Sequence, residues 1–185
     1  MRFLFLADMQ LGAYASVSGL DQATIGQLAE RDIYVDAVPK VAGFEWDSDR
    51  YSEAITMANS IRPDFVVIGG DMVDDNQSQE QLEEVFRITH RLDDGIPLYW
   101  VPGNHDIAVD TVVPTRHSIS KYREIFGRDY YAFDFGSYRF IVLNTVVVDH
   151  PEEVPEELDQ QMEFLQYELS RTSPGTALVF GHHPL

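Results

Sequence analysis

The sequence predicts an α/β fold in which buried parallel strands alternate with helices. Short apolar runs without polar alternation recur along the chain, as expected of strands that are buried on both faces. Two stretches with the apolar periodicity of helices separate the first three of these runs. The resulting β-α-β-α-β order is typical of a parallel sheet with right-handed crossovers.

The first strand is predicted at residues 2–7, and a long connection follows it. Residues 11–47 show a mixed pattern with several glycines and one short helical segment at about 22–31. Long loops beside a functional edge usually shape the pocket there. We therefore expect residues 11–47 to be an insertion that forms part of a pocket wall.

Two helices and two more strands come next. Apolar residues fall on one face of residues 48–61, and Pro63 ends that helix before a strand at 64–68. The pair Ser78 and Gln81 has the spacing of a capping box and predicts where the second helix begins. This helix ends at an Asp-Gly pair, directly before the third strand.

The third strand is expected at 96–101, and a short helix at about 118–126. Two β-type runs, 130–135 and 138–143, flank Gly136 and predict a hairpin. An acidic loop then leads into a helix whose apolar stripe is Leu158, Met162, Leu165 and Leu169. A last strand at 177–181 completes one predicted domain over residues 1–185, a length that suits a single core.

Composition limits the classes of protein and of site. Hydrophobic residues make up 44% of the chain, which is a globular value, and cysteine is absent. Disulfides and thiolate-bound metals are therefore excluded, and any metal must be held by oxygen and imidazole ligands. No apolar run approaches the roughly 20 residues of a membrane helix. The first apolar run is too short for a signal peptide, so we expect a cytoplasmic protein without a membrane partner.

The formal net charge is −18 at pH 7. Such a charge repels the phosphates of long nucleic acids, which makes nucleic acid an unlikely partner. A small phosphate substrate would need a local cation in this field. The charge therefore favours a metal site at the place where such a substrate binds.

Polar side chains follow four of the predicted strands, and open α/β sheets bind their ligands at such strand ends. The central motif is at 100–106, where an apolar run stops at a Pro-Gly break and an amide, an imidazole and a carboxylate follow. Together the four ends would bring six side chains to one edge: Asp8, Gln10, Asp71, Asn104, His105 and His182. This combination of ligand types predicts a metal centre.

Two divalent ions about 3.5–4 Å apart need a bridging carboxylate. Asp71 follows two glycines and is the best candidate for this bridge. Asp8 and Gln10 are two residues apart, so on an extended chain they point to one face and would bind the same ion. Asn104 and His182 would bind the second ion.

The candidate catalytic residues are His105 and Asp106. The ring of His105 would act on the substrate, and Asp106 would fix its tautomer. Each motif alone also has an ordinary structural explanation, such as a polar loop, a tight turn or a structural histidine. Three other histidines are expected to be solvated: His90, His117 and His150. The joint occurrence of the motifs at four strand ends favours the functional interpretation.

The four motifs resemble those of the calcineurin-like metallophosphoesterase superfamily. They are Asp8-x-Gln10, Gly70-Asp71-x-x-Asp74, Gly103-Asn104-His105-Asp106 and His182-x-Pro184. The usual first motif of that superfamily is Asp-x-His. The Asp-x-Gln form resembles a subgroup of calcineurin-like phosphoesterase-domain proteins that includes a protein serine/threonine phosphatase.

This resemblance implies a four-layer α/β/β/α sandwich with two divalent metal ions, which would be Mn, Fe or Zn, with Mg as an alternative. It implies a phosphoesterase that hydrolyses phosphate esters with a metal-activated water. The substrate would be a small molecule or a phosphoprotein, and a phosphodiesterase is a further alternative. By motif, one ion is bound by Asp8, Gln10 and Asp71, and the other by Asp71, Asn104 and His182, with His105 as the catalytic residue.

Two departures from the family pattern leave a second hypothesis open. The amide of Gln10 is a neutral ligand and binds metal more weakly than imidazole. The last motif of the family, Gly-His-x-His, does not occur before Leu185, so we expect the sequence to be a truncated form of a longer domain. The alternative function is a non-catalytic binding module that keeps the fold without the chemistry.

Overall fold

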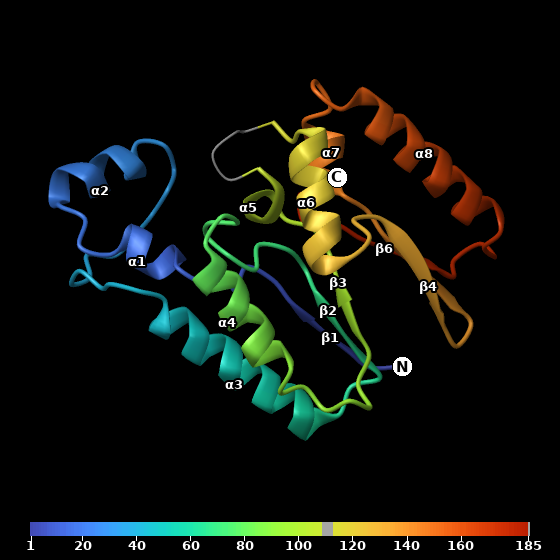
Figure 1. Cartoon of the computed structure of the whole chain (residues 1–185), viewed down its shortest axis with the longest axis horizontal. Helices are drawn as coiled ribbons and strands as arrows, with labels where there is room; N and C mark the ends of the chain where they lie inside the picture. The colour runs from blue at the N-terminus through green and yellow to red at the C-terminus, as the bar shows by residue number, and fades with distance from the viewer. Residues whose placement is uncertain (109–112, 185) are drawn as a thin grey trace.

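The computed structural model describes residues 1–108 and 113–184, and within these residues it contains two three-stranded sheets (Figure 1). The strands of the first sheet are parallel and lie in the order β1 (Phe3–Leu6), β2 (Phe65–Ile68) and β3 (Leu98–Trp100). The second sheet has the order β4 (Tyr131–Phe135), β5 (Tyr138–Val142) and β6 (Ala177–Phe180). The β4–β5 hairpin is antiparallel, as predicted, and β6 runs parallel to β5.

Helices cover the outer faces of the two sheets (Figure 1). Helices α3 (Glu45–Ile61) and α4 (Gln79–Thr89) pack on the first sheet. Helix α8 (Pro155–Ser170) lies on the second sheet, where Glu168 pairs with Arg139 of β5 at 2.7 Å. The remaining helices are α1 (Ala13–Val17), α2 (Gln22–Ala29), α5 (Asn104–Ile107), α6 (Arg116–Phe126) and α7 (Thr145–Asp149). The predicted α/β/β/α layering is confirmed.

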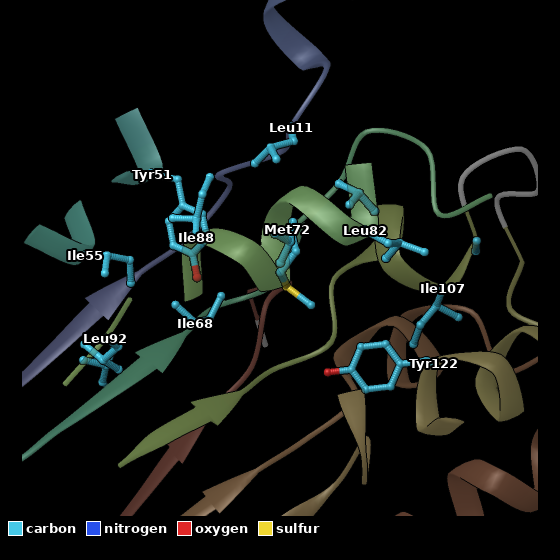
Figure 2. Packing of buried hydrophobic residues seen from close by; sticks show 14 of the residues in the cluster. Leu11, Tyr51, Ile55, Ile68, Met72, Leu82, Ile88, Leu92, Ile107 and Tyr122 are labelled. Carbon is cyan, nitrogen blue, oxygen red and sulfur yellow. The ribbon is translucent and has the colours of Figure 1, made fainter. Parts of the chain in front are cut away.

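Strand β2 is buried on both faces and contributes to two separate hydrophobic cores. Val66 and Ile68 point to the helix side, where they join Tyr51 and Ile55 of α3 and Ile88 of α4 (Figure 2). Phe65 and Val67 point to the other side and join the core between the sheets. This alternation explains why the strand shows an unbroken apolar run in the sequence.

The core between the sheets is largely aromatic. The ring of Phe65 stacks on Phe3 of β1 at 5.1 Å between centroids. The edges of Phe133 and Phe140 of the second sheet meet the same ring at 5.4 and 5.1 Å. Stacked and edge-to-face ring pairs add directional contacts to the burial of apolar surface. These rings fix the second sheet against the first and bring the end of β6 close to the ends of β1–β3.

The capping box predicted at the start of α4 forms only in part. The hydroxyl of Ser78 accepts a hydrogen bond from the Gln81 N–H at 3.4 Å. The Gln81 side chain turns away from Ser78 and accepts from the N–H groups of Asp74 and Asp75, at 3.1 and 2.9 Å. The start of α4 therefore holds the loop that follows β2 rather than closing on itself.

The helices α1, α5 and α7 were not expected from the sequence, because each has only four or five residues and shows no readable periodicity. In the described part of the chain, no helix combines the length and the apolar character needed to cross a membrane.

Candidate metal centre

The loops that follow β1 and β2 run side by side and have an unusual backbone. Three residues that carry predicted metal ligands have positive φ angles: Asp8 at 57°, Gln10 at 35° and Asp71 at 53°. Residues other than Gly, Asn and Asp rarely adopt this region, so Gln10 is the most unusual of the three, and such backbone strain concentrates at functional sites. The two loops hold each other through hydrogen bonds from Asp8 N to the Gly70 carbonyl (3.1 Å) and from Gln10 N to the Asp71 carbonyl (2.8 Å).

Two glycines allow the loops to approach closely. Gly70 has a φ of +96°, and a Cβ there would lie 2.6 Å from Nδ1 of His182 and 2.9 Å from Cα of Gly103. A Cβ on Gly103 would overlap the backbone nitrogen and the carboxylate of Asp71. A side chain at either position would therefore separate the motifs from one another.

Three of the predicted ligands converge from three strand ends. Asp8, Asp71 and His182 each offer a ligand atom within 4.8 Å of the others. Nε2 of His182 lies 3.4 Å from Oδ2 of Asp71, and its Nδ1 is 2.9 Å from the Gly69 carbonyl. The carbonyl fixes a hydrogen on Nδ1, so Nε2 is the ring nitrogen that can coordinate a metal.

The electrostatics around His182 reflect this acidic cluster. Burial lowers the pKa of the imidazole, but the carboxylate of Asp71, the Gly69 carbonyl and the charge of Asp8 outweigh it and raise the pKa of His182 to about 9. The cluster therefore attracts positive charge, and a divalent cation would replace the ring proton.

Asn104 joins the cluster through its side-chain oxygen. Its Oδ1 lies 3.2 Å from Nε2 of His182 and 3.1 Å from Nε2 of His183. His183 was not among the predicted site residues, since the motif at 182–184 pointed to His182 alone. The ring of His183 is partly buried between Asn104 and Asp149, whose Oδ2 lies 3.2 Å from its Nδ1.

The side chain of Gln10 is hydrogen-bonded to Asp74, which is not one of the predicted metal ligands. Its Nε2 donates to Oδ1 of Asp74 at 3.2 Å. Oδ2 of the same carboxylate accepts from the hydroxyl of Ser16 in α1, at 2.7 Å. Asp74 therefore joins the first motif and the start of the insertion to the loop after β2.

His105 is oriented by Asp74, and the expectation that Asp106 would orient it is wrong. Nδ1 of His105 is 2.8 Å from the Asp74 carbonyl and 3.7 Å from its Oδ1. The carboxylate of Asp106 instead accepts from the backbone N–H groups of Asp71 and Gly103, both at 2.8 Å, and of Met72 at 2.9 Å. Burial and the charge of Asp71 raise the pKa of Asp106 to about 7.

The donor set fits divalent cations. It offers carboxylate and amide oxygens with one imidazole nitrogen, which suits hard and borderline metals. Two neighbouring ligands of an octahedral ion with bonds near 2.1 Å lie about 3 Å apart. The separations of His182 Nε2 from the Asn104 and Asp71 oxygens, 3.2 and 3.4 Å, are close to this value.

The model of the calcineurin-like phosphoesterase family matches residues 1–185 of the chain. The chain belongs to the calcineurin-like phosphoesterase family. Its curated relatives in this family include the serine/threonine-protein phosphatase CPPED1 of Homo sapiens, which is 32% identical over 154 residues. The CPPED1 of Bos taurus is also 32% identical, over 158 residues. Both matches cover 77% of this chain and 48% of the relative, so the chain spans about half the length of these proteins.

Two solved structures of phosphatases share the fold of this family member. A purple acid phosphatase from yellow lupin (Lupinus luteus) superposes with a TM-score of 0.57 at 13% identity, over 97% of this chain and 29% of that one. A dimetal phosphatase from Danio rerio superposes with a TM-score of 0.54 at 16% identity, over 100% of this chain and 70% of that one.

Proposed function

We propose that this protein is a metal-dependent phosphoesterase that hydrolyses phosphate esters at a dinuclear centre. The observation that supports this most directly is the convergence of Asp8, Asp71 and His182 from three separate strand ends. Membership of the calcineurin-like phosphoesterase family supports the same activity.

The ligands divide between two ions around Asp71. One ion would be held by Asp8, Asp71 and the side-chain oxygen of Gln10, whose Nε2 already donates to Asp74. The second ion would be held by Asp71, His182 Nε2 and Asn104 Oδ1. The bridging role suits Asp71, which is nearly buried and whose Oδ1 is oriented by the N–H of His105 at 2.9 Å. We propose Mn, Fe or Zn for both positions.

The ions, when bound, polarise the phosphoryl oxygens and lower the pKa of water. His105 supplies the protein's own contribution. Because Nδ1 donates to the Asp74 carbonyl, the opposite nitrogen, Nε2, is the one that would meet the substrate. In the imidazolium form both ring nitrogens carry a hydrogen, and Nε2 would then donate its proton to the leaving oxygen. Asp106 holds the backbone of Gly103 and Asp71 in register, and therefore acts as a positioning residue.

The substrate that we propose is a phosphomonoester, with the phosphoserine or phosphothreonine of a protein as one form. The names of the CPPED1 relatives support this choice. The net charge of −18 disfavours long nucleic acid, whose phosphates it would repel.

Hydrolysis assays test the proposal directly. The full chain, loaded with Mn²⁺, should hydrolyse p-nitrophenyl phosphate faster than bis(p-nitrophenyl) phosphate. His105→Ala should lower kcat by about 10²–10⁴-fold, the usual contribution of a proton donor. His117→Ala, the same substitution on the exposed face of α6, should leave kcat unchanged. A preference for the diester would identify a phosphodiesterase. Metal-loaded protein that hydrolyses neither ester would support the binding module instead.

A further inference from the structure

The hydroxyl of Thr145 holds the backbone of the two consecutive histidines. Its Oγ1 accepts hydrogen bonds from His182 N at 3.0 Å and from His183 N at 2.8 Å. Thr145 is the first residue of α7 and is 1% exposed. A single buried oxygen from a distant segment therefore fixes the turn that carries both imidazoles.

A buried polar network fixes Thr145 in turn. The amide of Gln161 in α8 bonds to the backbone of Asn144 in both directions, from Asn144 N at 2.7 Å and to the Asn144 carbonyl at 3.1 Å. The Asn144 side chain donates to Asp129 at 3.0 Å and accepts from Val147 N at 3.3 Å. Networks that are fully bonded and buried are rigid, so the start of α7 is a firm support.

The methyl group of Thr145 restricts the same turn from its other side. A Cβ on Gly181 would collide with Cγ2 of Thr145. The turn is thus confined between a methyl group and a hydroxyl of one residue. From this position the two rings point to one atom, Oδ1 of Asn104, at 3.2 and 3.1 Å.

We propose that Thr145 is a positioning residue that presents His182 and His183 to Asn104 and so sets the affinity of the second metal ion. This inference rests on the proposed function, because it assigns Asn104 and His182 to that ion. Groups that orient metal ligands commonly change affinity by roughly 10- to 100-fold when they are removed.

Isothermal titration of the full chain with Mn²⁺ tests the inference. Asn104→Ala should abolish one of the two binding events and so identifies the one that belongs to the second ion. Thr145→Val keeps the shape of the side chain but removes the hydroxyl, and should weaken that binding event by about 10- to 100-fold. The other binding event should stay unchanged. Thr145→Ser restores the hydroxyl and should recover affinity to within about threefold of the wild type. Thr172→Val, whose hydroxyl bonds to the Glu168 carbonyl in α8, is the matched control and should bind as the wild type does.

A second variant covers the case in which Thr145→Val does not fold, as judged by thermal melting. Gly181→Ala retains the hydroxyl but pushes the turn away from Thr145, and should weaken the same binding event. Wild-type affinity in a folded Thr145→Val or Gly181→Ala protein would overturn the inference while leaving the proposed function intact. A wild-type protein that binds no Mn²⁺ would overturn both.

Discussion

The carboxylate of Asp106 accepts a hydrogen bond from the backbone N–H of Asp71 at 2.8 Å. The same carboxylate accepts from Gly103 N and Met72 N, and it is 4% exposed. It therefore ties the loop after β3 to the loop after β2 at the point where the proposed bridging ligand is located. The role of Asp106 is to hold the backbone of this centre together.

Asp106→Asn should destabilise the fold by about 1–3 kcal/mol, since an amide has one acceptor oxygen and leaves a buried N–H unpaired. Urea unfolding measures this change. Asp159→Asn, on an exposed part of α8, is the control and should stay within about 0.5 kcal/mol of the wild type. Equal stability of the Asp106→Asn and wild-type proteins would contradict the structural role.

Gly103→Ala should abolish metal binding, because the added methyl group overlaps the backbone and carboxylate of Asp71. Metal analysis of the purified variant measures the loss. Gly26→Ala is the matched control, since nothing lies within 4 Å of a Cβ there and the residue is inside α2. That variant should bind metal normally and be as stable as the wild type, or up to about 1 kcal/mol more stable. Full metal content in Gly103→Ala would disprove the close approach.

Gln10→His should raise affinity for the first ion by about tenfold or more, because imidazole is a stronger ligand than an amide. In the proposed assignment the second ion is bound by Asp71, Asn104 and His182, so its affinity should not change. Titration with Mn²⁺ separates the two binding events. If neither affinity changes, Gln10 is not a metal ligand.

The free energy of unfolding should fall above about pH 10, because the buried hydroxyl of Tyr51 resists ionisation. Burial raises the pKa of its hydroxyl to about 12, against the opposing effect of its hydrogen bond with Thr89. Unfolded tyrosine ionises near pH 10, so between about pH 10 and about pH 12 the unfolded state loses a proton that the folded state keeps. This contribution is present below about pH 10 and is lost as pH rises, by about 2–3 kcal/mol. Urea unfolding across this range should show a shallower decline for Tyr51→Phe, and identical slopes would contradict the assignment.

Much of the fold could be predicted from local patterns in the sequence. The apolar face of α3, the unbroken apolar run of β2 and the glycine turn between β4 and β5 each determine their own element. The pairing of β6 with β5 could not be read in this way, since it joins segments that are far apart in the sequence. The Gln81 side chain shows the same limit: its spacing predicts a bond to Ser78, but the tertiary structure offers it the N–H groups of Asp74 and Asp75.

The candidate site was predictable in its members but not in all of its contacts. Strand ends identified Asp8, Asp71 and His182, which the fold brings together. Adjacency in the sequence suggested that Asp106 would orient His105, but on the short helix α5 neighbouring side chains point in different directions. The partner of His105 comes from another loop, and only the packing of β2 beside β3 brings it there.

The bond between His182 and the Gly69 carbonyl spans 113 residues. Chains are synthesised from their N-terminus, and contacts between distant segments form late. The first sheet can close once β3 has left the ribosome, whereas the imidazole reaches the two aspartates only after β6 has paired with β5. A nascent chain would therefore carry the two aspartates before the imidazole joins them, and the complete set of ligands for a cation would form only after β6 has paired with β5.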